Sequence, residues 1–135
     1  MSKIINEVLH VNKEEIAVLK KNFNSNDVFI VEIDGINKRS WGDYITEIQS
    51  KFRFPTSCID SIDRYNDWMR DLEWIEEEKI ILIIDNYNWF IKDVPKVKSQ
   101  IISGLKDVIL PFWQDEVIEV VVEGKAKSFM VYLVN

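Results

Sequence analysis

The chain contains little cysteine, proline or glycine: one Cys, three Pro and four Gly in 135 residues. A single thiol, Cys58, excludes an internal disulfide and is compatible with a reducing compartment. The glycines are scattered, so no glycine-rich loop is available to hold phosphate. No apolar run approaches the roughly 18 residues of a membrane span, and charges interrupt the N-terminus where a signal peptide needs an apolar stretch. These absences predict a cytoplasmic protein with no cofactor, no redox chemistry and no membrane association.

Apolar and aromatic residues are abundant. Hydrophobic residues make up 47% of the chain, with five Trp, seven Phe and four Tyr, and 30% of residues are charged. This composition argues against disorder, and a chain of this length can bury somewhat under about 70% of the surface that it exposes when unfolded. We therefore expect a single globular domain.

Negative charge is concentrated in one segment. Residues 57–85 hold nine acids and three bases, a net charge of −6 that equals the net charge of the whole chain. Such asymmetry argues against nucleic acid as a partner and favours a basic protein that is steered to one patch.

Periodicity and capping residues predict alternating helices and strands. The predicted elements are a helix over 13–23 capped by Asn12 and Glu15, a strand over Val28–Asp34, a helix over 41–52 capped by Ser40 and broken at Phe54-Pro55, an acidic helix over 59–74, a central strand over Lys79–Asp85 covered on both faces, and a helix beginning at Pro95.

Near the C-terminus, Pro111 is expected to kink or end the last helix near Leu110, because proline lacks the donor that helix continuation needs. The β-branched stretch after residue 116 predicts two strands joined by a hairpin around Glu123-Gly124-Lys125. The order of elements predicts an α/β fold: a small, mostly parallel sheet packed with helices, with an extra C-terminal hairpin strand and an N-terminal helical extension. Residues 1–27 would form that extension, packed on a domain over 28–135.

The helix predicted over 59–74 carries four aspartates on one side. At about 100° per residue, Asp60, Asp67 and Asp71 fall within roughly 40° of one another, and Asp63 lies about 60° to one flank. The apolar residues on the opposite side are Cys58, Ile62, Tyr65, Met69 and Leu72. Like charges four residues apart cost a helix on the order of 0.2–0.5 kcal/mol per pair, so helix stability alone does not account for the acidic face.

Three other interpretations of these residues remain open. The aspartates can form an ordinary solvated face, with Arg64 pairing locally to Asp60 and Asp67. They can serve a small carboxylate or metal enzyme, although successive turns lie about 5–6 Å apart and an oxygen-rich calcium loop is missing, so no metal is expected. Cys58 can act as a nucleophile with His10 only if the fold brings the two together.

The stretch over residues 54–74 also resembles a known family. Phe54-Pro55 followed by Asp63, Asp67 and, more loosely, Leu72 resembles the barstar family, intracellular inhibitors of barnase-like ribonucleases. The segments "VEIDG", "KIILIIDN" and "SFMVYLVN" are similar to strands of that family, so the resemblance extends over residues 28–135. Ser57, Cys58 and Ile59 stand where the family usually has aromatics and a glycine, which puts barnase itself in doubt as the target.

The resemblance implies an inhibitor or immunity protein, not an enzyme, that blocks the cationic active site of a ribonuclease toxin with its acidic helix. Asp67 would replace a phosphate, Asp63 would flank it, and Asp115 or Glu116 would supply a third acidic contact. The expected partner-binding residues are Asp60, Asp63, Asp67, Asp71, Ser57 and Trp68. The free protein is expected to be monomeric. The alternative is a barstar-fold module that binds another basic protein or a toxin that is not a ribonuclease.

Overall fold

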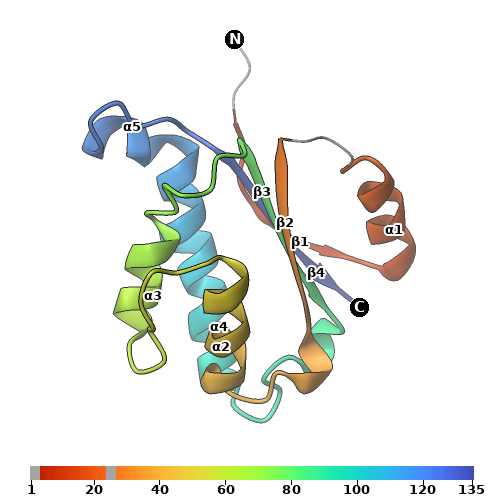
Figure 1. The fold of residues 1–135 in the computed structure, drawn as a ribbon. Coiled ribbons are helices and arrows are strands. Elements are labelled where there is room, and N and C mark those ends of the chain that lie inside the picture. The colour runs from red at the N-terminus through yellow and green to blue at the C-terminus, as the bar shows by residue number, and fades with distance from the viewer. Residues whose placement is uncertain (1–3, 24–26) are drawn as a thin grey trace.

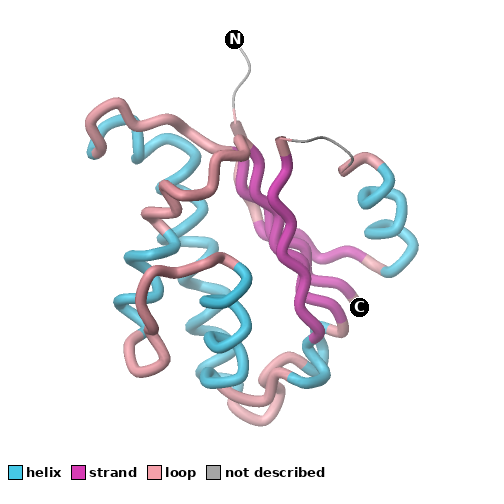
Figure 2. Tube along the Cα trace, in the orientation of Figure 1, coloured by secondary structure: helices cyan, strands magenta, loops and turns pink. Residues whose placement is uncertain are grey.

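A computed structural model describes residues 4–23 and 27–135 of the chain. Its centre is a four-stranded sheet in the order β1-β4-β3-β2, and every neighbouring pair is parallel (Figures 1 and 2). The strands are β1 (Val8–Val11), β2 (Val28–Asp34), β3 (Lys79–Asp85) and β4 (Ser128–Val134). Parallel neighbours need crossover connections, which the intervening helices supply. The predicted α/β fold with a small parallel sheet is confirmed.

The helices divide unequally between the two faces of the sheet. On one face lie α2 (Trp41–Lys51), α3 (Ile62–Met69), α4 (Pro95–Gly104) and α5 (Val117–Val120), and on the other lies α1 (Lys13–Lys21) (Figure 1). Because successive side chains of a strand point to opposite faces, Leu82 of β3 joins the larger core and Ile83 joins the smaller core with Ile16 of α1. The strand β3 is therefore buried on both faces, as its continuous apolar run predicts.

The predicted helix starts follow from their caps. The Oδ1 atom of Asn12 accepts a hydrogen bond from the N–H of Glu15 at 2.7 Å, and the Glu15 carboxylate accepts the N–H of Asn12 at 3.0 Å, which completes a capping box. The Oγ atom of Ser40 accepts the N–H of Asp43 at 3.1 Å. The helix that it opens ends at Lys51, shortly before Pro55.

The N-terminal segment contains a strand that the sequence prediction missed. Residues Val8–Val11 pair with β4 in the register Val8↔Val131 and form one edge of the sheet. Four residues are too few to establish a clear alternation of apolar and polar residues. Their extended conformation follows from pairing with β4, which the local sequence does not reveal. The helix predicted after them is present as α1.

We expected Pro111 to kink or end the last helix near Leu110, and the expectation that the helix ends there is wrong. Helical backbone continues from Pro95 through Val120, with Pro111 at φ −62° and ψ −34°. The proline lies between two π-helical segments, η3 (Leu105–Ile109) and η4 (Phe112–Glu116). Wider π turns accommodate a residue that cannot donate to the regular hydrogen-bond ladder.

The prediction of a C-terminal hairpin is also wrong, because β4 (Ser128–Val134) is the only strand in residues 117–135. Val117 is buried at the end of the long helix and holds the β-branched residues after it in helical geometry as α5. The turn at Gly124 then packs so closely that a Cβ there would clash with the carbonyl oxygen of Val117. The β-branched run indicated a strand, but tertiary packing decided for helix and turn. Within the described ranges, no helix has the length and apolar character that crossing a bilayer requires.

Candidate functional site: the acidic surface around α3

The acidic helix is shorter than predicted. It spans the eight residues Ile62–Met69, and the Oγ atom of Ser61 caps it by accepting the N–H of Arg64 at 3.1 Å. The chain leaves the helix after Met69 and passes through Leu72, which is buried and has a φ of 40°. Asp60 therefore precedes the helix and Asp71 follows it, so two of the four aspartates, not all four, lie on helical turns.

The carboxylates on this surface remain in water. The Asp67 carboxylate is 73% exposed and lies 2.8 Å from Arg70, while the Asp60 carboxylate is 84% exposed and lies 3.6 Å from Arg64. Asp63 is exposed and has no hydrogen bond or ion pair to any residue in the described ranges. Exposed pairs of this kind contribute only about 0.2–1 kcal/mol, so a stronger cation can displace either arginine.

The interpretation as a solvated face with local pairing is thus correct in part. Arg64 pairs with Asp60 as that reading expected, but Asp67 pairs with Arg70 instead of Arg64. Both arginines lie in the same short segment as their partners, three or four residues away. The pairs reduce the repulsion between the aspartates without turning the carboxylates inward.

The opposite side of α3 anchors it to the core. Of the predicted apolar stripe, Ile62 is half-buried and the other four members are fully buried. The hydroxyl groups of Tyr65 on α3 and Tyr44 on α2 hydrogen-bond to each other at 2.6 Å inside the core. Burial raises the pKa of Tyr65 well above its ordinary value, so this contact remains neutral. The two helices are therefore locked by a satisfied polar pair as well as by packing.

Four tryptophans further fix the segment that leads into and out of α3. Each buries at least part of its indole, and each Nε1–H forms a hydrogen bond that begins or ends in this segment, which satisfies the only polar atom of the side chain. The hydrogen bonds are Trp41 to the Ile59 carbonyl at 2.7 Å, Trp68 to Thr56 Oγ1 at 3.0 Å, Trp74 to the Phe52 carbonyl at 2.7 Å, and Trp113 to the Met69 carbonyl at 2.8 Å. The sequence displays the tryptophans, but their partners lie up to 44 residues away and only the fold reveals them.

The remaining predicted site residues occupy varied positions. Ser57 is exposed in the loop before α3, and its carbonyl accepts a hydrogen bond from Arg64 at 3.2 Å. Trp68 is half-buried, with its ring edge on Trp74, and so belongs partly to the core. Asp71 is partly buried and lines a cavity of about 320 Å³ between the end of α3 and the α5–β4 turn.

The two acids considered for a third contact lie in η4. Asp115 and Glu116 are both exposed, and neither lines the cavity beside the end of α3. Their part in binding stays a prediction.

The catalytic interpretations find no geometric support in the part of the chain that the structure describes. Cys58 is buried, its N–H donates to Gln49 Oε1 at 3.0 Å, and burial raises the pKa of its thiol. His10 lies on β1 against the ring of Tyr87, and no hydrogen bond joins it to Cys58. Among residues 4–23 and 27–135, no group of three or more His, Cys, Asp or Glu side chains is placed to hold a metal ion.

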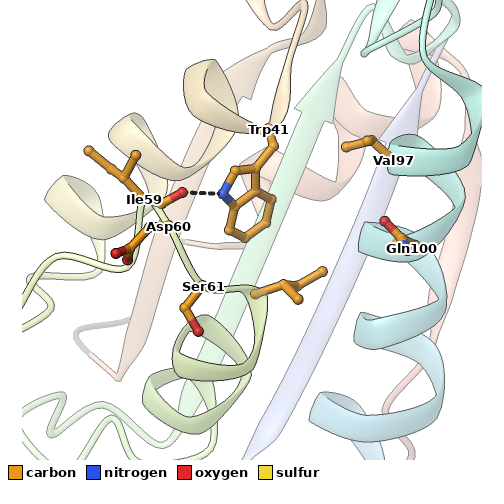
Figure 3. Close-up of a pocket in the computed structure, with 7 residues that line it drawn as sticks. Trp41, Ile59, Asp60, Ser61, Val97 and Gln100 are labelled. Atoms are coloured by element: carbon orange, nitrogen blue, oxygen red, sulfur yellow. Dashed lines mark hydrogen bonds between the residues drawn. The ribbon is translucent and has the colours of Figure 1, made fainter.

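A cavity of about 270 Å³ lies beside the leading end of α3, and no sequence pattern predicted it. It is bordered by the ring of Trp41, the loop residues Asp60 and Ser61, and the α4 residues Val97 and Gln100 (Figure 3). These residues come from three segments that are distant in sequence. Trp41 could be recognised as the residue after a helix cap, but not as the wall of a cavity.

Comparison with known proteins identifies the family. The family model of barstar, the barnase inhibitor, matches residues 28–125, from the start of β2 to the turn before β4. No match was found among curated proteins or solved structures. The matched part is well over half of the chain and includes β2, α2, α3, β3 and the long helix. The chain therefore belongs to the barstar family, whose members are inhibitors of barnase-type ribonucleases and not enzymes.

Proposed function

We propose that this protein inhibits a barnase-type ribonuclease by placing Asp63 and Asp67 of α3 in the cationic active site of the nuclease. The observation that carries the proposal is that both carboxylates lie exposed on a helix whose other side is fixed in the core. A ribonuclease site is built to hold phosphate, and a carboxylate accepts hydrogen bonds from the same arginine and histidine donors. Asp67 would take the place of a phosphate, with Asp63 one turn away as a flanking contact.

The rigidity of α3 supports this role. Ordering a loop or backbone segment on binding costs free energy, and the backbone around α3 is already held in place before the partner arrives. The Tyr44–Tyr65 pair and the tryptophan hydrogen bonds hold the backbone. Less of the free energy gained from the charged contacts is then lost to ordering the segment on binding.

The wider surface supports fast association. Residues 57–85 carry the entire net charge of −6, so their field attracts a basic partner before contact. We assign Asp60, Asp71, Ser57 and Trp68 to the rim of the interface, where contacts tune the rate and the register of binding.

The proposal is tested with purified barnase-type ribonucleases and an RNA-cleavage assay. The protein should inhibit at least one of them, and Asp67→Ala should weaken the complex by several kcal/mol, a magnitude taken from the barnase–barstar complex itself. Asp93→Ala is the matched control, because Asp93 is exposed, forms no ion pair with any described residue and lies on the chain between β3 and α4.

The association rate should fall as salt rises, because salt screens exposed charges beyond about 10 Å at 0.1 M. The proposal would be overturned if the parent protein and the Asp67→Ala variant inhibited equally in the cleavage assay and bound the ribonuclease with equal affinity in calorimetry.

A further inference from the structure

The cavity beside α3 is held open by fixed groups. The Nε1–H of Trp41 donates to the carbonyl of Ile59 at 2.7 Å, as the dashed line in Figure 3 shows. The same indole ring packs edge-on against the buried ring of Tyr65, with 5.4 Å between centroids and an interplanar angle of 87°. Trp41 is thus restrained by one hydrogen bond and by contacts with two aromatic rings, those of Tyr65 and Tyr44. The cavity exists before any partner binds, as ligand pockets commonly do.

The lining has an apolar body and an oxygen-rich rim. The apolar part consists of the Trp41 ring with Ile62 and Val97, and Figure 3 shows that ring between the 59–61 loop and α4. The rim contains Asp60 and Gln100, and among the described residues no lysine, arginine or histidine lines the cavity. A positively charged group with a flat or extended apolar part fits such a lining, whereas an anion would be repelled by the Asp60 carboxylate and would find no positive side chain among the described lining residues.

The rim groups are free to engage a ligand. The Asp60 carboxylate points away from the Trp41 ring in Figure 3, but it is 84% exposed and its ion pair with Arg64 is long, at 3.6 Å. Rotation toward the cavity therefore breaks only a weak contact. The side chain of Gln100 is exposed and makes no hydrogen bond with any described residue.

We propose that this cavity accepts an arginine side chain of the basic protein partner. The proposal rests on the function proposed above and names a second contact for the same partner. Arginine fits better than lysine, because its planar guanidinium stacks on an indole face and offers five donors to the rim oxygens. Asp60 and Ser61 lie in the cavity wall and lead directly into α3, so one partner can reach this cavity and the α3 carboxylates together.

The test uses a blocked amino acid and needs no nuclease. N-acetyl-arginine amide is titrated into the ¹⁵N-labelled protein, and the indole N–H signal of Trp41 is followed by NMR after assignment with Trp41→Phe. We expect a saturable shift at millimolar concentration, as for a small weak ligand. N-acetyl-citrulline amide, which has the same shape without the charge, should bind at least about fivefold more weakly.

Two surface variants separate this site from general charge attraction. Asp60→Asn should weaken arginine amide binding by about two- to fivefold, whereas Asp71→Asn, which removes the same charge away from the cavity, should leave it unchanged. Gln100→Lys should abolish the saturable shift. Equal binding of the arginine and citrulline probes, or equal effects of the two aspartate variants, would overturn the proposal.

The outcome can be distinguished from that of the nuclease assay. If Asp67→Ala inhibits like the parent while the arginine probe binds at Trp41, the proposed function fails and the cavity remains an arginine site. If the nuclease is inhibited through Asp67 but the probe does not bind, only the cavity proposal fails.

Discussion

Two sets of carboxylates in this protein have opposite surroundings. Beside β2 and α2, Glu47 contacts Lys38 at 2.6 Å and Lys51 at 2.7 Å, and the Lys38 side chain is only 8% exposed. On α3, Asp67 has only Arg70 from its own segment, and Asp63 has no partner in the described ranges. Glu47 ties α2 to the nearly buried Lys38 before it, whereas Asp63 and Asp67 face solvent. The comparison indicates which acids stabilise the protein and which are available to a partner.

The pKa values of the first set reflect these contacts. Burial opposes ionisation of Glu47, but hydrogen bonds from Lys38 and Lys51 hold its pKa below the ordinary value. Nearby, burial and then the hydrogen bond with Glu32 raise the pKa of Asp85 to about 7, so Asp85 retains a proton that an exposed aspartate would lose. The same hydrogen bond lowers the pKa of Glu32. Folding thus shifts the pKa values of Glu32, Glu47 and Asp85, so the ionisation of these acids contributes to the free energy of unfolding.

The largest expected effect comes from reversing the α3 charges. The double variant Asp63→Lys with Asp67→Lys should lower affinity for the inhibited ribonuclease by more than about 1,000-fold, since like charges would then meet in the interface. Its free energy of unfolding should stay within about 1 kcal/mol of the parent, because both positions are exposed. Inhibition titrations and urea unfolding measure the two quantities. A large loss of stability would show that the α3 aspartates stabilise the fold as Glu47 does, which would contradict the comparison.

The converse variant is Glu47→Gln. It should lower the free energy of unfolding by about 2 kcal/mol, because the nearly buried Lys38 ammonium would lose its carboxylate and keep mainly the Asn37 amide oxygen. Affinity for the ribonuclease should not change. Urea unfolding with Glu119→Gln as an exposed control makes the comparison. An unchanged stability would mean that this ion pair has no structural role.

Stability should depend on pH through Asp85. Its folded pKa of about 7 exceeds the ordinary value of 3.8, so the folded state binds the proton more tightly and stability falls as pH rises from about 4 to 7. The lowered pKa of Glu32 acts oppositely, but below its ordinary value of 4.5. We expect a loss of about 1 kcal/mol between pH 5 and 8 after solvent screening, measured by urea unfolding.

The variant Asp85→Asn should flatten that dependence, while Asp93→Asn should preserve it. Lys20, Glu32 and Asp34 surround Asp85 and remain in both proteins. A slope that persists in Asp85→Asn would assign the titration to another group.

The smallest effect is expected at Arg70. Replacing it in Arg70→Gln frees the Asp67 carboxylate from an exposed pair, so the free energy of unfolding should change by less than about 1 kcal/mol. The association rate at low salt should rise by about two- to fivefold, because one positive charge leaves the acidic surface. Stopped-flow measurements with Arg39→Gln as control decide this point, and slower association would contradict it.

Local signals in the sequence predicted the elements that depend on neighbours in the chain. The capping box at Asn12, the Ser40 cap and the apolar run of β3 were all confirmed, because capping and burial on both faces leave patterns within a few residues. The strand β1 and the helical ending at Val117–Val120 were missed, since pairing with β4 and packing of Val117 come from distant residues.

The site divides in the same way. The acidic residues and the buried side of α3 could be recognised from spacing, but the helix limits could not, because Ser61 competes as a cap with residues further upstream and Leu72 adopts a left-handed conformation. The pairing of Asp67 with Arg70 instead of Arg64 depended on side-chain geometry within one turn.

The sequence by itself determined the parallel α/β architecture, the family and the concentration of negative charge in one segment, since each is recorded in residue types and their order. Only the tertiary structure decided which carboxylates are tied to lysines, where α3 begins and ends, and that Trp41 borders a cavity beside it. These features depend on contacts between segments that the chain brings together only by folding, and linear spacing carries no information about such contacts.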